Sequence, residues 1–149
     1  MIELKNVTTA QKAESQMLSN YSLLLKNGSF CRLDKSLGEA VINVILGFQI
    51  IENGFVCFDG MPMTASSAFF FRKMIAYVPI PEGFEKVSDS SKKQLDMVNE
   101  ALSSDADIIL AVDPTSHQTE GVALNIMNAL RKKVTSGKVV IVATDRNDL

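Results

Sequence analysis

The sequence predicts an α/β fold, in which a mainly parallel sheet is flanked by helices and preceded by an antiparallel N-terminal β subdomain. The runs 108–112 and 139–143 are apolar at every position, which is typical of strands buried on both faces of a parallel sheet. A helical pattern at 122–134 lies between them, so strand, helix and strand form a right-handed crossover unit. Residues 2–7 instead alternate between apolar and polar, as half-buried antiparallel strands do.

The first half of the chain continues with shorter elements. Residues 21–25 form a second apolar strand that we expect to pair with 2–7, and 29–33 form a third. Residues 34–38 read as a polar loop. A helix then follows over 39–48 and is closed by Gly47.

The second half adds two strands and one long helix. Residues 55–58 end in an Asp-Gly turn, and 75–78 form a strand that two prolines stop from continuing. The apolar residues within 94–102 repeat at helical spacing. Three successive phenylalanines, 69–71, belong to a helix on the sheet, and because they cannot all face inward, one ring is a candidate partner contact.

Composition limits the classes of partner. A chain of 149 residues, 46% of them hydrophobic, can bury one core, and we expect a single domain over 1–149 because no linker or repeat divides it. A net charge of -2 supplies no basic surface, so nucleic acid is not expected as a partner. Cys31 and Cys57 follow no metal spacing, which favours reduced core thiols and a cytoplasmic setting. No apolar run approaches the about 18 residues that span a bilayer, so a membrane link would need a partner.

Six stretches of the chain are each common, but their occurrence together in this order is characteristic. Together they resemble the nucleotide-binding domain of ABC-transporter ATPases over nearly the whole length. The stretches are 2–7, 25–30, 43–48, 53–60, 72–79 and 113–116. The resemblance implies a P-loop NTPase fold, ATP and magnesium as ligands, a second ATPase subunit as partner and a membrane permease beyond it.

The phosphate loop departs from this family. A working loop needs glycines to bring backbone N–H groups close to phosphate, a lysine to reach the phosphates and a hydroxyl for magnesium. The matching segment here offers only Lys35, Ser36, Gly38 and Glu39. By the resemblance, Gly38 stands where the lysine belongs and Glu39 where the magnesium hydroxyl belongs. We therefore expect, at most, a degenerate phosphate site.

Other positions that the resemblance assigns to catalysis are also altered. Val112 replaces the acid tied to magnesium, while Asp113 stands at the position of the carboxylate that contacts the attacking water. Ile80 replaces a metal-contacting glutamine, and Asp145 replaces the switch histidine. The glycine-rich signature loop is reduced to 89–92.

Further departures concern the adenine and the helical subdomain. Ala10 offers no ring where the family stacks an aromatic residue on adenine. The stretch 81–93 is too short for the helical subdomain that docks on the permease. Each of these losses removes a contact that the family makes with nucleotide or with a partner.

Charged residues are expected to meet at one edge of the parallel sheet. Ligands bind beyond the carboxyl ends of such strands, and this edge gathers Asp34, Asp113 and Asp145 with Lys35 and Arg146 nearby. The acids would repel a triphosphate, and they could hold a hard cation or form a solvated rim of compensating charges. We expect the rim, with no bound metal. His117, the only histidine, is expected to be exposed and not catalytic.

These losses favour a pseudo-ATPase that does not hydrolyse ATP, binds no cofactor and acts as a binding or regulatory partner in an ABC-type complex. Such a chain would form a homodimer or a heterodimer with an intact ABC ATPase subunit, and would reach a permease only through that partner. One alternative is an ABC-transporter subunit that still binds ATP and magnesium, with Asp113 as a weak catalytic carboxylate. Another is a structural α/β interaction module that uses residues 69–71.

Overall fold

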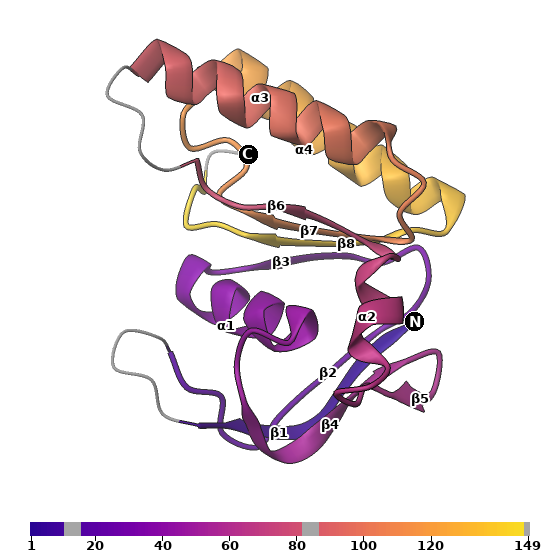
Figure 1. Cartoon of the computed structure of the whole chain (residues 1–149). Coiled ribbons are helices and arrows are strands. Elements are labelled where there is room, and N and C mark those ends of the chain that lie inside the picture. Colours follow the sequence, from indigo (N-terminus) through magenta and orange to yellow (C-terminus); the bar gives the residue numbers. More distant parts are fainter. Residues whose placement is uncertain (11–15, 82–86, 148–149) are drawn as a thin grey trace.

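The computed structural model describes residues 1–10, 16–81 and 87–147. It contains two four-stranded sheets (Figure 1). The first sheet is antiparallel, and its strands run in the order β2-β1-β4-β5. These strands are β1 (Ile2–Thr9), β2 (Tyr21–Leu25), β4 (Ile51–Phe58) and β5 (Met61–Pro62). The predicted antiparallel pairing of β1 with β2 is confirmed.

The second sheet is parallel and has the order β3-β8-β7-β6. Its strands are β3 (Phe30–Leu33), β6 (Ile75–Val78), β7 (Ile108–Val112) and β8 (Val139–Ala143). Every residue of β7 and β8 is buried, as their apolar sequences predict. Leu33 and Val112 both pair with Ala143, so three strands end at one edge of the sheet.

Helices separate and cover the sheets. Helix α1 (Lys35–Leu46) lies between the two sheets, while α3 (Val87–Ser103) and α4 (Glu120–Lys133) cover the other face of the parallel sheet (Figure 1). A 3-10 turn η1 (Val134–Ser136) and left-handed Gly137 end α4. One apolar cluster fills the space around α1, and a second fills the space under α3 and α4. The predicted α/β architecture is confirmed.

The predicted loop at 34–38 is wrong, because α1 begins at Lys35. Asp34 caps the helix: its Oδ2 accepts a hydrogen bond from the Leu37 N–H at 3.3 Å, and its carbonyl accepts one from the Gly38 N–H at 2.8 Å. Residues 34–38 are mostly polar, so the sequence pattern predicts a loop where the first helical turn lies. The other end is as predicted, since Gly47 adopts a left-handed conformation directly after Leu46.

The segment 89–92, interpreted as a remnant loop, also lies in a helix, because α3 begins at Val87. The inward-facing positions of this helix include Ser90, Gln94, Val98 and Ala101. They recur at helical spacing, but the first two are polar. Apolar periodicity alone therefore predicts a start for this helix that lies several residues after Val87.

Residues 69–71 all belong to the short helix α2 (Ala68–Arg72). Phe71 is buried and stacks on Phe58 with ring centroids 4.3 Å apart, whereas Phe69 and Phe70 are 62% and 65% exposed. The prediction that the three rings cannot all face inward is confirmed. Within the described residues, no helix combines the length and apolar content needed to cross a membrane.

Candidate functional site

The candidate site lies where the strands of the parallel sheet end and α1 begins. The first turn of a helix exposes N–H groups without intrahelical partners and carries partial positive charge. An anion would normally be attracted there. In this chain two of its own carboxylates occupy that place.

Asp145, after β8, reaches across to this helix terminus. Its Oδ1 accepts a hydrogen bond from the backbone N–H of Lys35 at 2.9 Å. The Asp34 carboxylate accepts the hydrogen bond of the Leu37 N–H. Two of the first three N–H groups of α1 are thereby satisfied from within the chain.

The side chain of Lys35 turns to a third acid. Its Nζ lies 3.3 Å from Oδ2 of Asp113, the residue directly after β7. The side chain of Lys35 is 39% exposed and that of Asp113 only 17%, so solvent screens the pair and its contribution to stability is under about 1 kcal/mol. Lys35 and Asp113, which are both candidate site residues, nevertheless contact each other.

The predicted gathering of Asp34, Asp113, Asp145 and Lys35 is thus confirmed as an arrangement in space. Arg146 joins the same edge, where its Nη1 donates to the carbonyls of Thr115 at 2.9 Å and Gln118 at 3.4 Å. Ser36 is exposed on the first turn of α1. In the described part of the chain, no group of three or more acidic, histidine or cysteine side chains is arranged to hold a metal ion.

Gly38 has a packing role in this structure. It faces the end of β8, where a Cβ added to Gly38 would lie 2.8 Å from the Cα of Ala143. Contacts this short essentially never occur between real side chains and backbone. Glycine therefore allows α1 to approach the sheet closely at this point.

The loop after β7 is held by a residue that the sequence did not single out as functional. Gln94 of α3 is fully buried, and its Nε2 donates to the Asp113 carbonyl at 2.8 Å and to Ser116 Oγ at 3.0 Å. Its Oε1 accepts from the His117 N–H at 3.0 Å and from Gln118 Nε2 at 3.2 Å. A polar residue at an inward-facing helical position was the signal that could have revealed it.

The expected exposure of His117 is wrong, since this residue is half-buried. Its backbone N–H is bound to Gln94, which holds the loop against α3. The sequence showed a histidine in a polar loop but not the helix that covers it.

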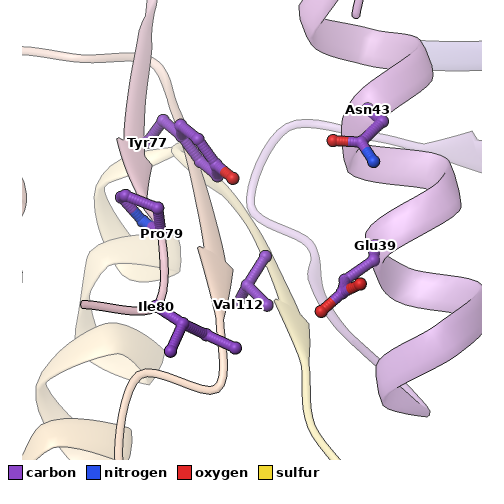
Figure 2. Close-up of a pocket in the computed structure, with 6 residues that line it drawn as sticks. All are labelled: Glu39, Asn43, Tyr77, Pro79, Ile80 and Val112. Atoms are coloured by element: carbon purple, nitrogen blue, oxygen red, sulfur yellow. The ribbon is translucent and has the colours of Figure 1, made fainter. Parts of the chain in front are cut away.

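A pocket of about 460 Å³ opens beside this edge (Figure 2). Glu39 and Asn43 project into it from α1, and Val112 comes from the end of β7. Tyr77, Pro79 and Ile80 form the facing wall, at and beyond the end of β6. Three of these residues, Glu39, Ile80 and Val112, stand at the positions that the resemblance assigned to magnesium contacts. They share one pocket here, but they provide one carboxylate and two aliphatic side chains.

Magnesium prefers an octahedron of oxygen ligands, usually with one or two carboxylates and substrate phosphates. Among the six residues lining this pocket, only Glu39 carries a carboxylate. Val112 and Ile80 offer no ligand atoms. The lining therefore does not fit a magnesium–nucleotide complex.

Two side chains have raised pKa values, Tyr21 on β2 and Cys31 on β3. Burial raises the pKa of the Cys31 thiol, so the thiolate is disfavoured and Cys31 is a poor nucleophile near neutral pH. Burial, with Cys31 and Asp34 as neighbouring negative groups, raises the pKa of Tyr21 as well. Both cysteines are free, and Cys57 is buried.

Neither a protein-family model nor a curated protein matches the sequence. The fold, however, is that of P-loop ATPases: a parallel sheet whose β3 leads directly into a helix, with helices on both faces and an antiparallel subdomain. More particularly, it is the fold of the ATP-binding proteins of ABC transporters, as solved structures show. The resemblance seen in the sequence is confirmed at this level.

Three of these structures illustrate the likeness. A putative ABC transporter ATP-binding protein from Pyrococcus furiosus aligns with a TM-score of 0.74 at 10% identity, over 98% of this chain and 92% of that one. An ATP-binding cassette solved as a dimer in a post-hydrolysis state, bound to ADP and phosphate, has a TM-score of 0.71 at 20% identity, over 98% and 88%. The protein cbiO1 from Clostridium perfringens, part of the ABC transporter complex cbiONQ, aligns with a TM-score of 0.69 at 13% identity, over 97% of this chain and 78% of that one. At these identities the shared property is the fold.

Proposed function

We propose that this chain is a single-domain pseudo-ATPase that serves as a binding or regulatory partner in an ABC-type complex. One observation carries the proposal: the helix terminus that would receive phosphate is already satisfied by Asp34 and Asp145. A triphosphate approaching this terminus would have to displace two carboxylates of its own charge sign. It would also have to separate Lys35 from Asp113.

The composition of the pocket supports the same proposal. Glu39 and Val112 replace a magnesium hydroxyl and a magnesium acid, so the metal that normally screens the phosphate charge has no ligand set here. The unscreened phosphates would then face the Glu39 carboxylate.

Titration calorimetry with ATP and magnesium tests the proposal. We expect no heat of binding and no release of phosphate above the rate in buffer. A dissociation constant in the micromolar range would contradict the proposal, because it would require the phosphates to displace both carboxylates.

The alternative of a weak ATPase is tested separately with Asp113→Asn. If Asp113 only pairs with Lys35, any residual phosphate release will be equal for the parent chain and the variant. Turnover that disappears in Asp113→Asn, alone or with an intact cassette added, would support catalysis by Asp113.

The exposure of Phe69 and Phe70 supports the partner role. Both rings lie on the surface of α2, and Nζ of Lys73 lies 4.5 Å from the centroid of the Phe69 ring. Aromatic residues are enriched at protein contact surfaces. If this surface joins two copies, size-exclusion chromatography will show a dimer that Phe70→Ser dissociates. Phe55→Ser, which changes another exposed ring on β4, is the control. A monomer in all three forms would contradict self-association through α2.

A further inference from the structure

We propose that the pocket between α1 and the ends of β6 and β7 binds an organic cation, meaning a guanidinium or ammonium group carried on an apolar body. This inference rests on the proposed function, because a pocket that held magnesium and nucleotide would not be available to a cation of this kind. It concerns the pocket in Figure 2.

The charge that the described residues give to the pocket comes from one side chain. Glu39 is the only charged residue among the six that line it, and it is half-buried. Figure 2 shows its carboxylate directed toward Val112 and Ile80. With the described residues, Glu39 forms no ion pair or side-chain hydrogen bond. A carboxylate partly withdrawn from water and without a partner is stabilised by a cation that donates hydrogen bonds to it.

The nearest basic residue on the same helix does not fulfil this role. Lys35 lies one turn before Glu39, but its Nζ is 3.3 Å from Asp113. Within the described residues, no cation therefore pairs with the negative charge of Glu39.

The walls decide which kind of cation fits. Val112, Ile80 and Pro79 present aliphatic surface, and Tyr77 adds an aromatic ring. A small hydrated metal ion prefers several oxygen ligands, and the Val112, Ile80 and Pro79 side chains have none. A guanidinium or ammonium group on an apolar body can bind Glu39 while its body covers the aliphatic wall and its charge lies near a ring.

Asn43 adds a polar contact on the same side. It follows Glu39 by four residues, so both side chains project from one face of α1 into the pocket (Figure 2). The amide oxygen of Asn43 can accept a second hydrogen bond from a planar cation. The volume of about 460 Å³ lies within the usual range for small-molecule sites.

Benzamidine is the probe, and benzamide, which has the same shape without the charge, is its matched control. Titration followed by amide NMR shifts should show saturable benzamidine binding centred on Glu39 and Val112, and much weaker binding of benzamide. In Glu39→Gln the dissociation constant should rise at least tenfold, because a hydrogen bond to a charged group is worth about 1.5–3 kcal/mol. Glu52→Gln, an exposed glutamate on β4, should leave it unchanged.

The same chemistry could come from an arginine of a second copy, and chromatography distinguishes the two sources. A monomer that binds benzamidine assigns the pocket to a free small molecule. A dimer that dissociates both in Glu39→Gln and on adding benzamidine assigns it to a second copy. Equal binding of benzamidine and benzamide, equal affinity in Glu39→Gln, or no binding at all would overturn the inference.

Calorimetry with ATP and magnesium distinguishes a failure of the cation site from a failure of the proposed function. If neither ATP nor benzamidine binds, the cation site is refuted and the pseudo-ATPase proposal stands. If ATP binds, both proposals fail.

Discussion

Gly38 lies against Ala143 so closely that a Cβ on the glycine would come within 2.8 Å of the alanine Cα. The residue that a sequence comparison places in a phosphate loop thus has a packing reason to be glycine. It joins α1 to the end of β8, the same point at which Leu33 and Val112 pair with Ala143. The junction between helix and sheet depends on this contact.

Gly38→Ala should therefore destabilise the protein despite the better helix propensity of alanine. Overpacking of this kind costs about 1–3 kcal/mol, which exceeds the gain of up to about 1 kcal/mol from propensity. The free energy of unfolding from urea titration measures the difference. Gly121→Ala in α4 is the control, because a Cβ there meets no atom within 4 Å and should cost nothing.

A second substitution identifies the cause of the loss. Ala143→Gly removes the Ala143 Cβ, which the new methyl group would also meet, but leaves the Cα in place, so it should recover part of the stability lost in Gly38→Ala. Equal stability of Gly38→Ala and Gly121→Ala would show that the approach of α1 to β8 is looser than described.

Asp145→Ala removes the acceptor for the Lys35 N–H and should lower the free energy of unfolding by about 0.5–1 kcal/mol. The effect is modest because Asp145 is exposed. Since part of it is an interaction between a charge and the helix terminus, the loss should shrink at high salt. Asp105→Ala, at another exposed loop aspartate, should change stability by less than about 0.5 kcal/mol. Matching losses in the two variants would mean that Asp145 does not stabilise α1.

Gln94→Leu keeps the approximate size of a buried side chain but leaves the His117 N–H without its partner, while the Asp113 carbonyl keeps only its hydrogen bond from the Ser116 N–H. We expect a loss of about 1–3 kcal/mol in the free energy of unfolding, since this is the cost of one buried polar group left unsatisfied. Asn99→Leu, on the exposed side of the same helix, is the control. Hydrogen exchange should show faster exchange of the His117 amide in Gln94→Leu. An unchanged exchange rate would argue against Gln94 as the residue that holds this loop.

The raised pKa values of Cys31 and Tyr21 predict that stability falls on the alkaline side. Both groups stay protonated in the folded protein at a pH where the unfolded chain has begun to lose these protons. Their contribution is complete below the unfolded values, about 8.5 for cysteine and 10 for tyrosine, and is lost as pH rises through the folded pKa values.

Urea unfolding between pH 7 and 10.5 measures this dependence. Cys31→Ala should reduce the loss of stability in the lower part of this pH range, because it removes the group with the lower pKa in the unfolded chain. The loss at higher pH, due to Tyr21, should remain but become smaller, because burial still raises the pKa of Tyr21 while the contribution of Cys31 is removed. A decline of the same slope in Cys31→Ala would assign the loss at lower pH to another group.

Several elements could be predicted from sequence because one physical constraint dominated each of them. The apolar runs of β7 and β8 can only be buried, and Gly47 ends α1 because the left-handed conformation it adopts favours glycine. The starts of α1 and α3 were missed for the opposite reason. Their first turns are polar, and the inward positions of Ser90 and Gln94 become visible only when the covering loop is known.

The sequence by itself determined the α/β class, the order of strands and helices, and the substitutions Glu39, Ile80 and Val112 at positions where a magnesium site would need ligands. The class and the order depend on local periodicity and on residue type, whereas the magnesium positions come from the resemblance to ABC-transporter ATPases. Only the tertiary structure decided that these three residues share a pocket, that Asp145 takes the Lys35 N–H, and that Lys35 turns to Asp113. Such contacts join residues far apart in the chain, so they depend on which strands are neighbours and on where each strand ends.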